Sequence, residues 1–274
     1  MKRMLLSLSM VVTGTVLIAF AGCGGGGDET SSTTSKLKQG GIFKVGNTSD
    51  VDAIDPAVAY GTISWWLEYA TAAKLFNYPD REGATGGQLR PEIASSYQVS
   101  NDGKTYTFTI RDGFKFSDGK PVTAENFKYA INRVLNKDLN SPAAPFITDP
   151  SGTNIVGASD VLAGKAEEAS GVVVRGNKLL IHLEKANGAF LAQISMPFFQ
   201  ATPLSLPLTK PIVAVKGHQL PSAGPYYVSN RQPDRSIQLK RNPYYKKGPG
   251  RTRPHYRTAC STPRASTSRR VSCR

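Results

Sequence analysis

The sequence contains few of the residues on which catalytic and metal sites usually depend. Its 274 residues include three histidines and three cysteines, and no cysteine lies between Gly24 and Ala259. The central part of the chain therefore has no disulfide framework. The motifs HExxH, Cys-x-x-Cys, GxSxG and the P-loop are absent, which argues against zinc peptidases, serine hydrolases and P-loop enzymes. We expect no catalytic residue, no metal site and no cofactor.

Acidic residues are missing from the C-terminal segment 251–274, which carries seven arginines. With Lys2 and Arg3, these arginines supply nine of the fourteen net positive charges. The rest of the chain is only mildly basic and contains no nucleic-acid recognition motif, so we expect no nucleic-acid partner. The tail has no apolar period, and we expect it to be disordered. Its composition is typical of a shifted reading frame in a GC-rich gene; the alternative is a genuine basic tail.

A long apolar run occurs only at the N-terminus, from Met4 to Phe20, after two basic residues. This pattern predicts a signal peptide over residues 1–22 and not a permanent membrane span. The residues Phe20-Ala21-Gly22-Cys23 resemble the lipobox of bacterial lipoproteins, in which leucine is preferred where Phe20 stands. The resemblance implies that Cys23 is acylated and inserts into the lipid bilayer. The alternative is an ordinary signal peptide followed by an unrelated cysteine.

Residues 23–40 lack large apolar side chains, apart from Leu37, and are rich in glycine, serine and threonine. This composition predicts a flexible tether. The chain as a whole is 39% apolar and 20% charged, values that fit a globular protein with an ample core.

The most informative stretch, residues 89–136, begins with a predicted hairpin. Tyr97–Ser100 forms a short strand, and an Asp-Gly turn follows it. From Thr105 to Ile110 threonines alternate with Tyr106, Phe108 and Ile110. This period of two predicts an antiparallel strand with one buried face.

An amphipathic helix is predicted directly after the hairpin. Thr123 is a favourable N-cap, and Glu125 places a negative charge in the first turn. A single apolar stripe then follows at helical spacing, comprising Phe127, Ala130, Ile131, Val134 and Leu135.

The same stretch resembles the bacterial extracellular solute-binding proteins of family 5, which include the dipeptide- and oligopeptide-binding components of ABC importers. The family pattern is D-G-x-T-Y-T-F, an arginine, then K-F-x-D-G-x-P-x-T-A before an amphipathic helix. The matching residues are Pro91, Asp102-Gly103, Thr105–Phe108, Arg111, Lys115-Phe116, Asp118-Gly119, Pro121 and Thr123-Ala124. Further similar strands at 222–228 and 235–245 extend the resemblance from residue 40 to residue 250.

The resemblance implies an α/β, two-lobed, periplasmic-binding-protein-like fold of type II, of which residues 41–250 supply the N-terminal half only. By this resemblance, residues 41–60 and 171–250 build one lobe, and residues 61–170 build a satellite subdomain. Residues 251–274 are then an aberrant basic tail.

The function implied by the resemblance is that of a substrate-binding component of an ABC transporter. Such a protein captures a peptide or another small solute and delivers it to a permease in the membrane. The location implied is the outer face of the cell membrane or the periplasm. Two alternatives stay open: a non-functional truncated remnant of such a protein, and a lipoprotein sensor with the same fold.

Three residues are candidates for ligand contact because the family places them near its cleft. Asp50 and Asp52 follow a predicted first strand over Gly41–Asn47, and Phe146 lies in a proline-rich loop over 139–150. The alternative for the two aspartates is a role in turns and helix caps. Asp55, before a proline, is predicted to be structural.

Other elements are predicted from local signals. A helix is expected over Thr62–Tyr78, and its Trp65 and Trp66 are expected to be buried, with ligand stacking as the alternative. A second hairpin is expected over 172–183, and a helix from Asn187 to Met196 that Pro197 ends.

Overall fold

The computed structural model describes residues 41–217 and 219–246. The predicted signal peptide, the tether with Cys23 and the basic tail lie outside these residues. The chain divides into two units, residues 1–46 and 47–274. Of the first unit only residues 41–46 are described, and they form neither helix nor strand.

The predicted first strand over Gly41–Asn47 is therefore wrong for this structure. Ile42, Phe43 and Val45 are all exposed, and none of the described strands pairs with this segment. A strand is stable only when a neighbour satisfies its backbone N–H and C=O groups. The apolar residues of this segment suit a strand, but the segment itself does not adopt one.

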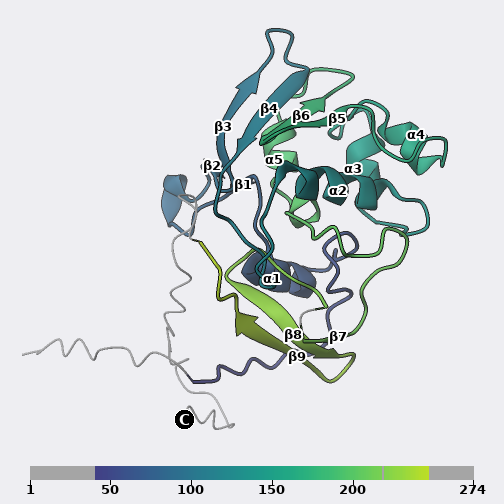
Figure 1. Cartoon of the computed structure of the whole chain (residues 1–274). Helices are drawn as coiled ribbons and strands as arrows, with labels where there is room; N and C mark the ends of the chain where they lie inside the picture. The colour runs from purple at the N-terminus through teal and green to yellow at the C-terminus, as the bar shows by residue number, and fades with distance from the viewer. Residues whose placement is uncertain (1–40, 218, 247–274) are drawn as a thin grey trace, which may run out of the picture. The chain divides into compact units, whose positions relative to one another are not determined.

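The main sheet contains four antiparallel strands in the order β3-β4-β6-β5 (Figure 1). Both predicted hairpins are confirmed: β3 (Ala94–Val99) pairs with β4 (Thr105–Ile110), and β5 (Val172–Arg175) pairs with β6 (Lys178–His182). Gly103 in the first turn has a φ of 69°, which explains the Asp-Gly sequence.

The two hairpins are joined through β4 and β6, in which Phe108 lies opposite Leu179. Tyr106, Phe108 and Ile110 are buried as the alternation predicts. The pairing joins strands from both sides of residue 170, where the sequence predicts a boundary between satellite and lobe. That division stays a prediction.

Helix α2 (Ala124–Leu135) packs against β5 and β6 (Figure 1). Its whole predicted apolar stripe is buried. The helix begins at Thr123, whose backbone N–H donates to the side-chain oxygen of Asn126 at 2.8 Å. Asn126 also donates to the carbonyl of Thr202 at 3.0 Å, so this helix start is tied to a distant loop. The predicted cap is confirmed, and Asn126 completes it.

Helix α1 covers Thr62–Thr71 and is shorter than the helix predicted over Thr62–Tyr78. After Thr71 the backbone becomes extended, and β1 (Phe76–Asn77) pairs with β2 (Arg90–Pro91). The backbone N–H of Lys74 donates to the Glu92 carboxylate at 3.0 Å. Pairing with residues 90–94 thus replaces the helical hydrogen bonds that local propensity predicts.

A smaller sheet, in the order β7-β8-β9, contains Val215–Lys216, Tyr226–Gln232 and Ser236–Arg241. Helix α1 packs against β8 (Figure 1). A second apolar cluster, separate from the main core, includes Leu67 of α1 and Val228 of β8. The strands predicted near 222–228 and 235–245 are confirmed, with shifted ends.

The remaining elements are short. They are the helices α3 (Ala144–Thr148), α4 (Ala158–Leu162) and α5 (Phe190–Gln193), and the 3-10 turns η1 (Gly83–Thr85) and η2 (Pro197–Phe199). Asn187 accepts the N–H of Ala189 at 2.9 Å, but α5 is much shorter than the helix predicted to reach Met196. No helix in the described part of the chain is long and apolar enough to cross a membrane.

Candidate ligand-binding site

Asp52 lies in the loop before α1, and its carboxylate is fully engaged by that helix and its approach. It accepts the backbone N–H of Tyr60 at 2.8 Å, the N–H of Gly61 at 2.9 Å and the hydroxyl of Ser64. Burial raises the pKa of Asp52, but these hydrogen bonds outweigh burial and hold the pKa below its usual range. Asp52 therefore has a structural role, because it links the loop before α1 to the first turn of that helix.

Asp50 is turned to a different part of the fold. It accepts the backbone N–H of Asp234 at 2.8 Å, which is the main reason that its pKa is lowered, and it pairs with Arg231 of β8 at 3.0 Å. The carboxylate therefore ties the loop of residues 50–52 to β8 and its following turn. The structure does not bring Asp50 and Asp52 together on one ligand position.

Phe146 belongs to an aromatic cluster, which we define as Tyr60, Trp65, Phe146 and Phe198. The Tyr60 ring stacks on Phe146 and Phe198, with centroids 6.4 and 6.1 Å away, and meets Trp65 edge-on at 6.5 Å. Phe198 is buried, Trp65 and Phe146 are half-buried, and Tyr60 is 53% exposed. Three separate segments thus build an apolar floor below one accessible tyrosine.

Tyr60 connects two of the predicted candidates, because Asp52 holds its backbone N–H and Phe146 stacks on its ring. Sequence reasoning missed Tyr60. The available signal was weak: a tyrosine followed by glycine just before a predicted helix, eight residues after an aspartate. Ligand contact by Asp50, Asp52 and Phe146 stays a prediction.

The two tryptophans have different environments. The Trp65 indole N–H donates to the carbonyl of Ala59 at 3.0 Å, and the ring packs against the main core. Trp66 is 64% exposed, so the prediction that it is buried is wrong. Consecutive residues on a helix point about 100° apart, and the core side of α1 has room for one of the two rings.

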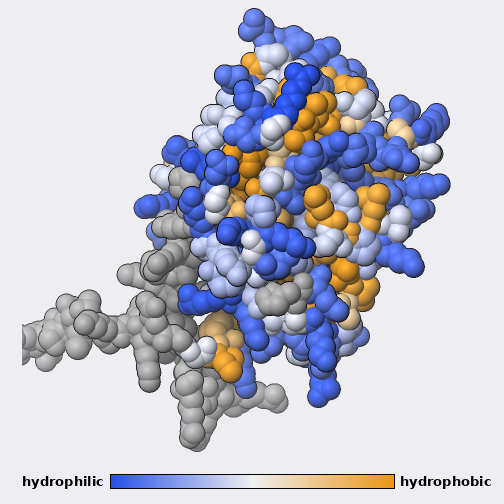
Figure 2. All heavy atoms as spheres, viewed as in Figure 1, coloured by the Kyte–Doolittle hydropathy of each residue, from blue (hydrophilic) through white to orange (hydrophobic). Residues whose placement is uncertain are grey.

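Other apolar side chains are exposed elsewhere in the described part of the chain, among them Leu204 and Val213. Figure 2 shows a mostly polar visible face that is interrupted by separate apolar patches. Scattered patches of this kind are normal on soluble proteins. In the aromatic cluster the exposed Tyr60 ring is held by the rings around it, and its backbone N–H is held by Asp52.

Asp55 forms a buried ion pair with Arg133 of α2, with both hydrogen bonds at 2.8 Å. Asp55 also accepts the backbone N–H of Ile212 at 2.9 Å, and Arg133 donates to the carbonyl of Pro207 at 2.8 Å. The prediction that Asp55 is structural is confirmed. The pair fixes the loop that carries Asp52 and Tyr60 against α2.

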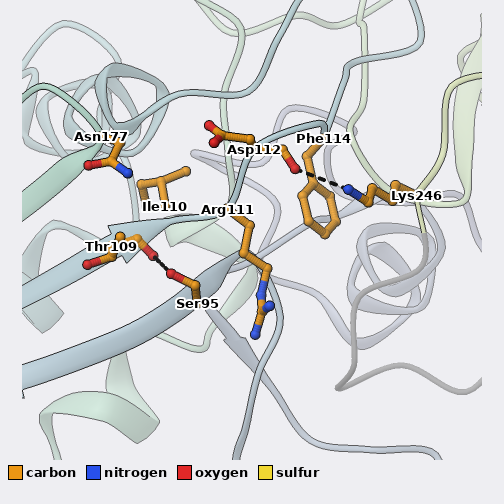
Figure 3. A pocket seen from close by; sticks show the side chains of 8 residues that line it. All are labelled: Ser95, Thr109, Ile110, Arg111, Asp112, Phe114, Asn177 and Lys246. Atoms are coloured by element: carbon orange, nitrogen blue, oxygen red, sulfur yellow. Dashed lines mark hydrogen bonds between the residues drawn. The ribbon is translucent and has the colours of Figure 1, made fainter.

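A hollow of about 400 Å³ elsewhere in the fold is lined by Ser95, Thr109, Ile110, Arg111, Asp112, Phe114, Asn177 and Lys246. Figure 3 shows that the guanidinium of Arg111 points away from Asn177, while Lys246 reaches the backbone carbonyl of Asp112. The Nε–H of Arg111 donates a hydrogen bond to the carbonyl of Ala94 at 3.1 Å. The polar groups do not converge on one point, so this hollow is the weaker candidate.

The aromatic cluster presents a ring surface that suits an apolar or aromatic group, through stacking and burial. The nearby carboxylate of Asp52 already accepts three internal hydrogen bonds. Among the described residues, no group of three or more His, Cys, Asp or Glu side chains is arranged to hold a metal ion.

Comparisons with known proteins bear on the family and the fold of the chain. A model of the family described as "Bacterial extracellular solute-binding proteins, family 5 Middle" matches residues 88–264. That match continues past Arg251, into the segment predicted to be unrelated to the family.

Individual relatives cover much of the chain. The dipeptide-binding protein DppE of Bacillus subtilis (strain 168) is 27% identical over 244 residues, which are 88% of this chain and 42% of DppE. The probable D,D-dipeptide-binding periplasmic protein DdpA of Escherichia coli (strain K12) is 35% identical over 108 residues, which are 39% of this chain and 21% of DdpA. The chain spans less than half the length of these relatives.

A solved structure of the murein tripeptide-binding protein MppA, in its unliganded open form, superposes with a TM-score of 0.61 and 27% identity. The superposition covers 72% of this chain and 37% of MppA. The predicted fold class, part of a type II α/β periplasmic-binding-protein fold, is confirmed.

Proposed function

Because this chain belongs to the bacterial extracellular solute-binding proteins of family 5, we propose that it acts in substrate capture for an ABC transporter. The observation that carries the proposal is the family match over residues 88–264. In this role the protein binds a peptide or a similar small solute outside the cytoplasm and delivers it to a membrane permease. The role requires no chemical step, so we propose that the protein is not an enzyme.

Peptides are the solute class that the relatives favour. DppE, DdpA and MppA are named for binding dipeptides, D,D-dipeptides and a murein tripeptide, respectively. We extend this class to the present chain as part of the proposal. Acylation of Cys23 then keeps the protein at the outer face of the membrane, close to the permease.

The aromatic cluster is the ligand contact that we propose for the described residues. Tyr60 offers a half-exposed ring, and Phe146 and Phe198 keep that ring from turning away. Asp52 fixes the backbone from which the ring projects. A preorganised aromatic face of this kind favours an apolar side chain of the ligand, because little conformational entropy is lost on binding.

The test is calorimetric titration of the purified chain, without its signal peptide, with tripeptides Ala-Xaa-Ala in which Xaa is Phe, Leu, Ala or Glu. We expect the Phe and Leu peptides to bind more tightly than the Ala and Glu peptides. Tyr60→Ala should reduce this preference by about tenfold, which corresponds to the loss of roughly 1.4 kcal/mol of stacking and burial.

Tyr78→Ala is the matched control, because Tyr78 is also exposed but lies outside the cluster. Equal losses in both variants would contradict the assignment of the site to Tyr60. If the chain is folded but binds none of the peptides, the proposal that this chain captures peptides is rejected, and the alternative of a truncated remnant is favoured.

A further inference from the structure

Glu68 is a buried acid that the proposed function does not use. It lies in α1 and is only 2% exposed. Its carboxylate accepts a hydrogen bond from the side-chain amide of Gln200, which is also buried. Among the described residues, no lysine or arginine forms an ion pair with it. A carboxylate in such a place is strongly disfavoured relative to the neutral acid.

The charged groups that act on Glu68 are of the same sign. Asp52 and Asp55, from the loop before α1, both act on it through space. Each of these two acids already has its own donors, and Asp55 has the guanidinium of Arg133. Other titratable groups on α1 and the segments near it are Tyr69 of α1, Lys74 after α1, Glu92, which accepts the backbone N–H of Lys74, and Tyr226, Tyr227 and Arg231 of β8; Arg231 is paired with Asp50.

Gln200 links Glu68 to the aromatic cluster. It directly follows η2, and its backbone N–H donates to the carbonyl of Pro197 at 3.1 Å. The middle residue of η2 is Phe198, whose buried ring lies under Tyr60 and meets Trp65 edge-on at 5.7 Å. The hydrogen bond between Glu68 and Gln200 therefore joins α1 to the turn that supports the exposed ring.

We propose that Glu68 is a positioning residue for the aromatic cluster, which acts as an uncharged acid through Gln200 and Phe198. When Glu68 loses its proton, the new charge faces Asp52 and Asp55 in a buried space. The hydrogen bond from Gln200 favours the charged form, but burial and the two like charges outweigh it. The contact between α1 and η2 then loosens, Phe198 moves from under Tyr60, and the floor of the cluster is lost. The effect on ligand affinity rests on the proposed function, whereas the effect on the cluster does not.

The direction of the pH dependence follows from the site. Burial, with smaller contributions from Asp55 and Asp52, raises the pKa of Glu68 to about 8, against the opposing hydrogen bond from Gln200. The cluster is then intact below pH 8 and loosens as the pH rises through 8. This range lies below the usual pKa of tyrosine, about 10, so Glu68 can be titrated separately.

Trp65 can report on the cluster through its fluorescence. The chain has one other tryptophan, Trp66, which can be replaced. In a Trp66→Phe background the fluorescence of Trp65 alone is measured from pH 6.5 to 9.5. We expect the emission to shift to longer wavelength with a midpoint near pH 8. Adding Glu68→Gln, which keeps the neutral amide shape, should abolish the shift and hold the low-pH spectrum throughout.

Two results would overturn the proposal: the same pH shift with Glu68→Gln present, or a flat profile in the Trp66→Phe parent. If circular dichroism shows that the glutamine variant does not fold, the carboxyl carbon of Glu68 is followed by NMR in ¹³C-glutamate-labelled protein. A titration midpoint below pH 6 in that measurement would also overturn it.

The ligand consequence is measured separately, with Ala-Phe-Ala binding at pH 6.5 and 9.5. Affinity should fall by about tenfold for each pH unit above the Glu68 pKa, as linkage to one proton requires, and should not fall with Glu68→Gln. A Trp65 shift without peptide binding at any pH would reject the proposed function but retain the role of Glu68. Peptide binding with no pH dependence and no Trp65 shift would reject the role of Glu68 alone.

Discussion

Breaking the ion pair between Asp55 and Arg133 should strongly reduce stability, because neither side chain has any exposed surface. Asp55→Ala leaves the Arg133 guanidinium buried without its partner. We expect the free energy of unfolding to fall by about 3–5 kcal/mol, measured by urea denaturation. The matched control is Glu168→Ala, which removes an acid from a largely exposed pair with Lys128 and should cost less than about 1 kcal/mol.

Replacing both members of the pair separates burial of charge from loss of contact. The double variant Asp55→Ala/Arg133→Met should recover part of the loss, because no unpaired charge then remains in the interior. A double variant that is less stable than Asp55→Ala alone would show that the hydrogen bond from Arg133 to Pro207 contributes more than removal of the unpaired charge recovers.

Cys23 decides the location of the protein in our proposal. Cys23→Ser should move the protein from the membrane fraction to the soluble fraction, because each acyl CH₂ buried in the bilayer contributes about 0.8 kcal/mol. The measurement is metabolic labelling with a fatty acid, followed by fractionation. Equal labelling of both proteins would mean that the residues before Cys23 form an ordinary signal peptide.

At the scale of elements, the start of α2 combines a cap with a long-range tie. Thr123→Ala should cost about 1 kcal/mol. Asn126→Ala should cost more, about 2 kcal/mol, because Asn126 bonds both Thr123 and Thr202. Phe127→Ala should cost about 3–5 kcal/mol, because it leaves a cavity. If urea denaturation shows that Thr123→Ala lowers the free energy of unfolding more than Asn126→Ala does, the hydrogen bond to Thr202 does not contribute as argued.

The elements that were predictable from sequence are those whose signals are local. The alternation at Tyr106, Phe108 and Ile110 and the helical stripe from Phe127 to Leu135 each specify a buried face without information from elsewhere. The end of α1 was not predictable, because Phe76 leaves the helix to pair with Pro91. Helix propensity depends on nearby residues only and cannot indicate a pairing partner that lies far along the chain.

The candidate site was less predictable than the fold, for the same reason. The family resemblance singled out Asp52 and Phe146, but the residue between them, Tyr60, is defined by contacts among three separate segments. Asp50 shows the same limit of sequence reasoning at another residue. Its partners, Arg231 and Asp234, lie far along the chain, so the sequence could not show that its carboxylate was already occupied.

At the scale of the whole molecule, the buried Glu68 makes folding stability depend on pH. The carboxyl has a pKa of about 8 when folded and 4.5 in its ordinary state. Between these values only the unfolded chain has lost the proton. The free energy of unfolding should therefore fall as the pH rises from 4.5 to 8, by up to about 1.4 kcal/mol per pH unit.

Above pH 8 this group adds no further slope, because both states are ionised. Urea denaturation at pH 5, 6, 7 and 8 measures the trend, and Glu68→Gln should flatten it. If the glutamine variant keeps the full slope, another titrating group is responsible.

The pairing of β4 with β6 also has a consequence for the order in which the chain folds. Thr109 and Lys178 are neighbours in the sheet but are separated by about seventy residues in sequence. Each hairpin can form early from nearby residues, whereas joining them requires closure of a long loop. During synthesis, β3, β4 and α2 leave the ribosome before β5 and β6 exist. The apolar stripe of α2 then lacks β5 and β6, the strands against which it packs, and stays exposed until they arrive.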